Sequence, residues 1–166
     1  MDTGDRVGSR GEGMDSLHGI SRLDGVRVLL VEGEPQVREL VADVLSQCGA
    51  RVTAVDSAVK GLAMLKQDTP DALVSGLSLP DKDGYWLIRE VRSLPSDQGG
   101  AVPAAAFTGA SEVEDRQNAL RAGFQVHLSK PADLRKLAEV VAFLSQNQSV
   151  AAQHRVPNQS SPGGRS

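Results

Sequence analysis

Ala72-Leu73-Val74-Ser75-Gly76-Leu77-Ser78-Leu79-Pro80 is the stretch that decides the fold of this chain. Its first residues are short and mostly apolar, which is typical of a strand buried on both faces of a parallel sheet. The proline-ended segment after Gly76 predicts a loop at the carboxyl end of that strand. Open α/β sheets bind their ligands at this end of the strands. We therefore expect the functional site around Ser75 and Gly76.

Apolar segments of strand length alternate with amphipathic helical segments on both sides of this stretch. The expected strands are residues 26–31, 51–55, 72–75, 102–107 and 125–128. The expected helices are 35–49, 57–67, a segment around 84–91, 111–123 and 133–144. Pro35 suits the first turn of a helix and Gly49 suits its end. Strict alternation predicts an α/β fold with a parallel sheet, right-handed crossovers and helices on both faces.

The two ends of the chain differ from its middle. Residues 1–24 are rich in glycine with scattered Arg, Asp and Ser, and residues 146–166 are dominated by Gln, Asn, Ser, Pro and Gly. Neither segment has the period of a helix or a strand. We therefore expect one folded domain, residues 25–145, between two disordered tails.

Composition excludes several classes of function. The 166 residues carry a net charge of −3, so no broad basic field favours nucleic acid. No apolar run approaches the roughly 18 residues of a membrane span, and the N-terminal segment lacks a secretory signal, so we expect a cytoplasmic protein without membrane contact. The single cysteine, Cys48, excludes an intramolecular disulfide and is interpreted as a small buried residue.

Four short motifs follow the expected strands. They are Val31-Glu32-Gly33-Glu34-Pro35, Leu79-Pro80-Asp81-Lys82-Asp83-Gly84-Tyr85, Phe107-Thr108-Gly109 and Leu128-Ser129-Lys130-Pro131. With these motifs in this order, residues 25–145 resemble the receiver domain of bacterial two-component response regulators. The resemblance implies a flavodoxin-like, five-stranded parallel sheet in the order 2-1-3-4-5.

The resemblance also implies a chemistry that this sequence only partly supports. A receiver accepts a phosphoryl group on an aspartate that ends its third strand, and an acidic pair ending the first strand helps to bind a divalent cation. Here Gly76 stands at the phosphoacceptor position, and the acidic pair is Glu32 and Gly33. Glu32, with Glu34 nearby, is expected to bind Mg²⁺ weakly at most, and no other cofactor is expected.

Three residues match the remaining switch positions of a receiver. Thr108 matches the hydroxyl residue that moves toward the phosphoryl group, Lys130 matches the lysine that pairs with it, and His127 occupies the position of the rotating aromatic residue. Each also has a structural interpretation. Thr108 suits a strand end, Lys130 suits either solvent or an ion pair with Glu32, and His127 suits a half-buried surface position.

These residues favour an atypical single-domain response regulator, a pseudo-receiver that signals by contact and without phosphorylation. Its expected partners are a histidine kinase, another regulator or a second copy of itself, bound through about residues 111–145. That segment offers apolar and charged residues together: Ala119, Ala122, Val126, His127 and Ala138 beside Arg121, Lys136 and Glu139.

Two alternatives remain open at this stage. A displaced residue could accept the phosphoryl group, the candidates being Ser75, Ser78, Asp81 and Asp83. The vacated pocket could instead bind a small anion or nucleotide near Thr108 and Lys130. No nucleophile–base pair and no glycine-rich phosphate loop is recognisable, so we expect no enzymatic activity.

Overall fold

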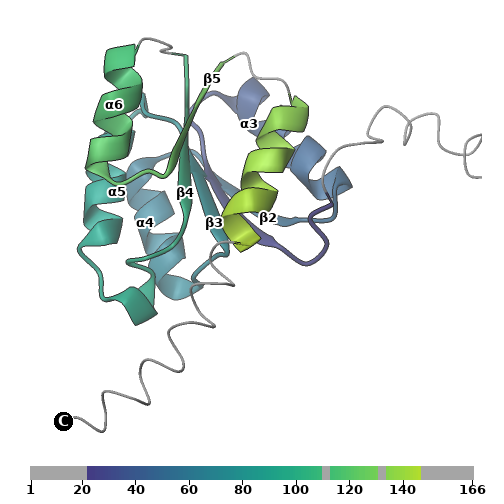
Figure 1. Ribbon diagram of the computed structural model, residues 1–166, viewed down its shortest axis with the longest axis horizontal. Helices are drawn as coiled ribbons and strands as arrows, with labels where there is room; N and C mark the ends of the chain where they lie inside the picture. The colour runs from purple at the N-terminus through teal and green to yellow at the C-terminus, as the bar shows by residue number, and fades with distance from the viewer. Residues whose placement is uncertain (1–21, 110–112, 131–133, 147–166) are drawn as a thin grey trace, which may run out of the picture.

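The computed structural model describes residues 22–109, 113–130 and 134–146, and it is built around a five-stranded parallel sheet (Figure 1). The strand order is β2-β1-β3-β4-β5, which confirms the predicted flavodoxin-like order. The strands are β1 (Arg27–Val31), β2 (Arg51–Val55), β3 (Ala72–Ser75), β4 (Ala104–Thr108) and β5 (Val126–Ser129). All four residues of β3 are buried, as expected for the central strand of a sheet covered on both faces.

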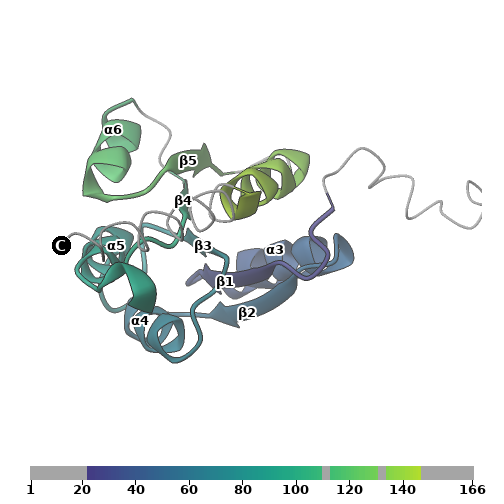
Figure 2. The same cartoon turned by 60° about the horizontal axis from the view of Figure 1, so that its bottom comes forward.

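Helices cover both faces of the sheet (Figure 2). The labelled elements are α3 (Pro35–Gln47), α4 (Ala58–Gln67), α5 (Gly84–Arg92), the short 3₁₀ helix η1 (Ser96–Gln98) and α6 (Val113–Ala122). A C-terminal helix spans residues 134–146 and lies with α3 on one face, whereas α4, α5 and α6 lie on the other. In the segments that the structure describes, no helix is long and apolar enough to cross a membrane.

Strand side chains on the two faces of the sheet pack into two separate hydrophobic clusters. Val28 and Leu30 of β1 pack with α3 and the C-terminal helix, whereas Leu29 and Val31 pack with α4 and α5. Strand side chains alternate between faces, so a strand buried on both sides must be apolar at every position. This requirement explains the continuous apolar runs in the sequence.

Several boundaries differ from the predicted ones. Leu23, which the sequence analysis assigns to a disordered tail, is fully buried, and its N–H donates to Cys48 O at 2.7 Å. The packed unit therefore begins before residue 25. Strand β4 begins at Ala104 and not at residue 102, because the N–H of Val102 is used in a turn to Gly99 O and Pro103 has no N–H.

Some expectations fall on residues outside the described part of the chain. These are most of the two tails (residues 1–21 and 147–166) and the expected starts of two helices, at residues 111 and 133. Cys48, by contrast, is described and is buried at the end of α3, where burial raises the pKa of its thiol above the ordinary value. That position agrees with its interpretation as a small core residue.

Candidate functional site

The carboxyl ends of β1 and β3 bring Glu32 and Gly76 together. Val31 pairs with Ser75 in the parallel register, and the Gly76 N–H donates to Val31 O at 2.8 Å. The Glu32 N–H donates to Val55 O at 3.0 Å, so the sheet hydrogen bonding continues one residue beyond β1. A Cβ atom placed on Gly76 would lie 3.3 Å from Glu32 Oε1. The side chain of Glu32 thus borders the space where Gly76 lacks one.

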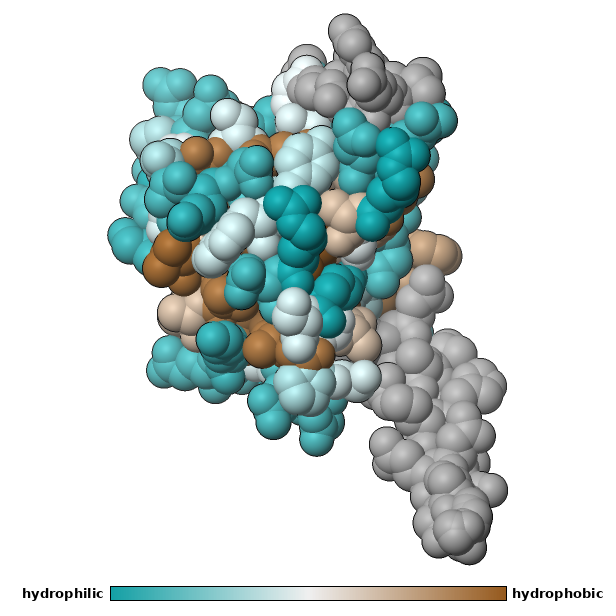
Figure 3. All heavy atoms as spheres, turned by 90° about the vertical axis from the view of Figure 1, so that its left-hand side faces the viewer, coloured by the Kyte–Doolittle hydropathy of each residue, from teal (hydrophilic) through white to brown (hydrophobic). Residues whose placement is uncertain are grey.

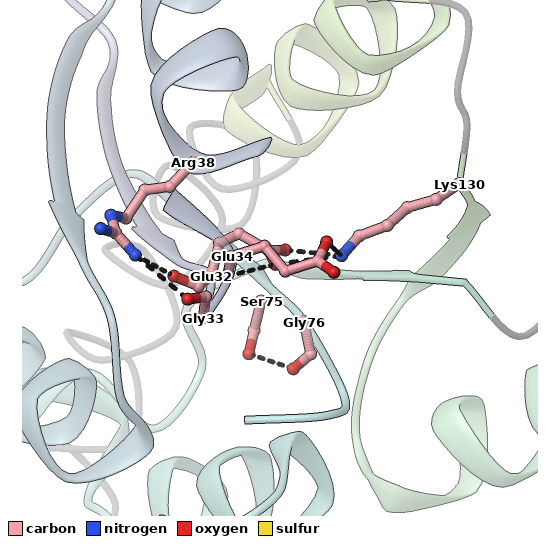
Figure 4. A network of polar contacts seen from close by, with 7 residues as sticks. All are labelled: Glu32, Gly33, Glu34, Arg38, Ser75, Gly76 and Lys130. Atoms are coloured by element: carbon pink, nitrogen blue, oxygen red, sulfur yellow. Dashed lines mark hydrogen bonds and ion pairs between the residues drawn. The ribbon is translucent and has the colours of Figure 1, made fainter. Parts of the chain in front are cut away.

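Lys130 forms an ion pair with the buried carboxylate of Glu32 (Figure 4). The Glu32 residue is 1% exposed, and Lys130 Nζ lies 2.9 Å from Oε1 and 3.0 Å from Oε2. Only the contact with Oε2 has hydrogen-bond geometry, so the shorter approach to Oε1 is a charge contact. The Glu34 N–H also donates to Oε2, at 3.1 Å. Of the two structural interpretations of Lys130, the structure therefore shows the ion pair.

Neighbouring groups hold this pair in place. The Lys130 N–H donates to Thr108 O at 2.7 Å, which fixes the backbone beside the end of β4. The Lys130 ammonium lies 5.4 Å from the centre of the Phe107 ring and 3.7 Å from Oε1 of the mostly exposed Glu34. The lysine charge is therefore compensated by two carboxylates and an aromatic face.

Arg38 in the first turns of α3 is a site residue that the sequence analysis did not identify. Its Nη1 donates to Glu32 O at 2.8 Å and to Gly33 O at 3.5 Å, which ties the loop after β1 to the helix. The sequence signal was an arginine three residues after Pro35, a spacing that directs the side chain back over the first turn. Many surface arginines share that spacing, so it could not single this one out.

The other two switch positions lie on neighbouring strands. Thr108 ends β4 as a buried residue, paired in register with Ser129, directly before Lys130. His127 is half-buried in β5, opposite Ala106. The topology therefore places Thr108 at the same sheet edge as Lys130 and Glu32, whereas His127 lies two residues before the carboxyl end of β5. Any switching role for Thr108 or His127 stays a prediction.

Comparison with known proteins identifies the family. The family described as "Response regulator receiver domain" matches residues 28–142, which include nearly all of the sheet and α3 to α6. This chain belongs to the response regulator receiver family. It is 40% identical over 114 residues to a Leptolyngbya boryana protein named only "Uncharacterized 14.6 kDa protein in sodA1 3'region", covering 69% of this chain and 86% of that protein.

Other relatives are longer proteins. The Escherichia coli KDP operon transcriptional regulatory protein KdpE is 36% identical over 110 residues, covering 66% of this chain and 47% of KdpE. The sensor histidine kinase RcsC of Salmonella typhi is 29% identical over 123 residues, covering 74% of this chain and 13% of RcsC. This receiver therefore matches less than half of KdpE and a small part of RcsC.

Solved structures agree with the fold. The receiver domain of the sensor histidine kinase PA1611 from Pseudomonas aeruginosa superimposes with a TM-score of 0.68 at 30% identity, over 74% of this chain and 98% of that chain. That crystal structure has a magnesium ion coordinated in its active-site cleft. A CheY-like receiver from Methanospirillum hungatei gives a TM-score of 0.70 at 22% identity, over 77% of this chain and 99% of that chain.

The oxygen donors of this receiver do not suit a tightly bound Mg²⁺. The ion prefers six oxygen ligands in octahedral geometry, usually including one or two carboxylates. Here Gly33 and Gly76 contribute no side chain, and both oxygens of Glu32 lie within 3.0 Å of the Lys130 ammonium. Among the described residues, no group of three or more His, Cys, Asp or Glu side chains could hold a metal ion.

The loop after β3 uses its polar residues for local structure. Ser75 is fully buried and its Oγ donates to Gly76 O at 2.8 Å. Asp83 caps α5 by accepting from the Trp86 N–H at 2.8 Å, the capping role expected of an aspartate before Gly84. Asp81 accepts from the Ala58 N–H at 3.0 Å and the Val59 N–H at 2.9 Å at the start of α4.

Asp81 thus caps a helix that lies more than 20 residues earlier in the chain, and we expect its loss to destabilise the fold. Burial raises the pKa of its carboxyl, but hydrogen bonds from Val59 and Ala58 outweigh burial and hold the pKa below the ordinary 3.8. We expect Asp81→Ala to lower the free energy of unfolding by about 1 kcal/mol at neutral pH. Because the folded-state pKa is depressed, this difference should fade as the pH falls through that value. Urea unfolding at several pH values would measure it.

A matched control is Ser78→Ala, an exposed residue of the same loop. This variant should stay within about 0.5 kcal/mol of the wild type at every pH. Equal unfolding midpoints for the two variants would show that the Asp81 contact contributes nothing.

Proposed function

We propose that this receiver is a pseudo-receiver, which acts in two-component or phosphorelay signalling as a protein-binding module without being phosphorylated. One observation carries the proposal: the position next to the Glu32 carboxylate is Gly76, so the site has no carboxylate nucleophile. A phosphoryl group is transferred between oxygen atoms held in line, with its negative charge compensated by cations. Because Gly76 has no side-chain oxygen, this position cannot accept the phosphoryl group.

The Lys130–Glu32 pair gives independent support. A phosphoryl group needs a free cation beside it, whereas the Lys130 ammonium already contacts both carboxylate oxygens of Glu32. Recruiting Lys130 to a phosphate would leave the buried Glu32 carboxylate unpaired, which costs several kcal/mol. The pair therefore favours one fixed arrangement over a switchable one.

The proposed binding surface is formed by α6, β5 and the C-terminal helix, with one correction to the residues expected there. Ala119 and Ala138 are fully buried, because each lies on the core face of its helix, and neither is available to a partner. Leu120, 44% exposed, is an apolar residue that α6 does present. Exposed charged residues of the same surface are Arg121 on α6 and Lys136 and Glu139 on the C-terminal helix.

The partner that we propose is a histidine kinase, another regulator or a second copy of this chain. The names of two relatives, a sensor histidine kinase and a transcriptional regulatory protein, support a two-component setting. A small apolar centre with a charged rim resembles a transient interface more than a permanent one.

Intact-mass spectrometry after incubation with acetyl phosphate and Mg²⁺ tests the absence of phosphorylation. We expect the wild-type mass to stay unchanged. The matched control is Gly76→Asp, which restores an acceptor carboxylate and should gain one phosphoryl group wherever the remaining pocket still supports transfer. A stable phosphoryl group on the wild type would overturn the proposal. Mapping that group to Ser78, Asp81 or Asp83 would support the displaced acceptor.

A further inference from the structure

A hollow lies between α5 and α6, on the side of the molecule shown in Figure 3. Its volume is about 400 Å³, within the usual size of small-ligand pockets. Among the described residues, five line it: Tyr85 and Arg89 from α5, and Asn118, Arg121 and Ala122 from α6. Hydrophilic and apolar side chains lie next to one another on this side (Figure 3).

The polar lining of the hollow is dominated by hydrogen-bond donors. Arg121 Nη2 donates to Asn118 Oδ1 at 2.8 Å, so the amide oxygen is used and the amide NH₂ group is left as a donor. The backbone carbonyl of Arg89 accepts from Ser93 Oγ at 2.9 Å, but its guanidinium makes no hydrogen bond or ion pair with any other residue that the structure describes. Within the described chain, neither guanidinium has a carboxylate partner. Two uncompensated guanidinium groups in one hollow favour an anionic ligand.

Arg92 fixes the walls of this hollow. From the last turn of α5, its Nε and Nη2 donate to Gly123 O, which follows α6, at 3.0 and 2.8 Å. Its Nη1 donates to Gly100 O at 2.9 Å and to Val102 O at 2.7 Å. The bonds to Gly123 O tie the ends of α5 and α6 together, so the backbone of both walls is fixed before a ligand binds.

The sheet edge is the weaker place for an anion. There the positive charge of Lys130 is already compensated by Glu32, and the buried carboxylate would repel a second anion. An anion is therefore better supported in the hollow at Arg89 and Arg121 than in the vacated pocket near Lys130.

We propose that this hollow binds the phosphate group of a small nucleotide, such as a nucleoside monophosphate. The guanidinium groups of Arg89 and Arg121 bind the phosphate oxygens, and the Tyr85 ring contacts the base. Two guanidiniums match the double charge of a phosphate monoester better than the single charge of a carboxylate. The ring offers a flat apolar surface to a base. The site does not depend on the pseudo-receiver proposal, because it shares no residue with the sheet edge.

The test is an NMR titration of the ¹⁵N-labelled full chain with AMP and, separately, with inorganic phosphate. We expect saturable shifts of the Tyr85, Arg89, Asn118 and Arg121 amides with both probes, and tighter binding of AMP. Arg89→Gln and Arg121→Gln should each weaken AMP binding about tenfold, the effect of losing one charged hydrogen bond. The control is Arg116→Gln, an exposed arginine of α6 outside the hollow, which should leave the affinity unchanged.

Several results would overturn the proposal. They are no shift with AMP, shifts confined to the sheet edge, or an equal loss of affinity in the Arg116→Gln variant. If AMP binds no more tightly than inorganic phosphate, a nucleotide is excluded as the ligand of this hollow. A glutamate-rich peptide that shifts these amides when AMP does not would assign the hollow to an acidic protein segment. Phosphorylation by acetyl phosphate would leave the nucleotide site unaffected, so the two proposals can fail separately.

Discussion

Replacing Lys130 with methionine is expected to lower the free energy of unfolding by about 3 kcal/mol, which corresponds to a fall in Tm of about 10 °C. The reason is that the substitution leaves Glu32 without its counter-ion. Glu32 is 1% exposed, and without the ammonium its carboxylate keeps only the Glu34 N–H at 3.1 Å as a described hydrogen bond. A buried charge without a counter-ion is far more costly than the loss of a surface pair. Urea and thermal unfolding of the two proteins would measure the difference.

Lys60→Met is the matched control. Lys60 also forms an ion pair, with Asp56 at 3.1 Å, but both side chains are largely exposed, at 65% and 47%. Exposed pairs of this kind contribute about 0–1 kcal/mol, so this variant should unfold almost like the wild type. Equal losses for Lys130→Met and Lys60→Met would show that the Lys130 pair does not stabilise the fold.

The double variant E32Q/K130M tests whether the stability lost in K130M comes from the unpaired charge of Glu32. It removes both charges from the buried site, so it should recover most of the stability that K130M loses. A double variant as unstable as K130M would locate the loss in the packing of the lysine side chain.

The fold could be predicted from the sequence because its decisive signals are local. Strands β1, β3 and β4 are short, largely apolar runs, and Pro35, Gly49 and Asp83 mark helix ends by their own backbone chemistry. The family resemblance then placed Glu32, Gly76 and Lys130 at one edge of the sheet, where the structure has them. A parallel topology leaves little freedom there, because all of the strands end at the same edge.

The contacts that escaped prediction join residues distant in sequence or depend on the rotation of a helix. Asp81 caps α4 across more than 20 residues, and an aspartate in a loop gives no sign of which helix it reaches. Ala119 and Ala138 were expected on the surface because alanine fits a small interface as well as a tight core. The α5–α6 hollow joins Arg89 to Arg121, and no motif spans these two residues.

Introducing both missing carboxylates, in the variant G33D/G76D, is expected to make the stability of this receiver depend on Mg²⁺. The backbone admits both side chains with small adjustments. A Cβ at residue 33 would lie 3.2 Å from Pro80 Cδ, and one at residue 76 would lie 3.3 Å from Glu32 Oε1. Without metal, four carboxylates, those of Glu32, Glu34 and the two new aspartates, would share the Lys130 ammonium, so we expect the variant to unfold more easily than the wild type.

Bound Mg²⁺ should reverse that loss, because a ligand that binds only the folded state stabilises it by about 2.7 kcal/mol at a hundredfold excess over its Kd. Thermal unfolding in MgCl₂ and in EDTA would measure the effect, with no change expected for the wild type. The matched control is G109D, because residue 109 is exposed and a Cβ there would have no neighbour within 4 Å. It adds a carboxylate near this sheet edge without completing the donor set. A G33D/G76D variant that is equally stable in MgCl₂ and EDTA would contradict the prediction. That result would show that the loops around Glu32 have lost the geometry of a metal site as well as its carboxylates.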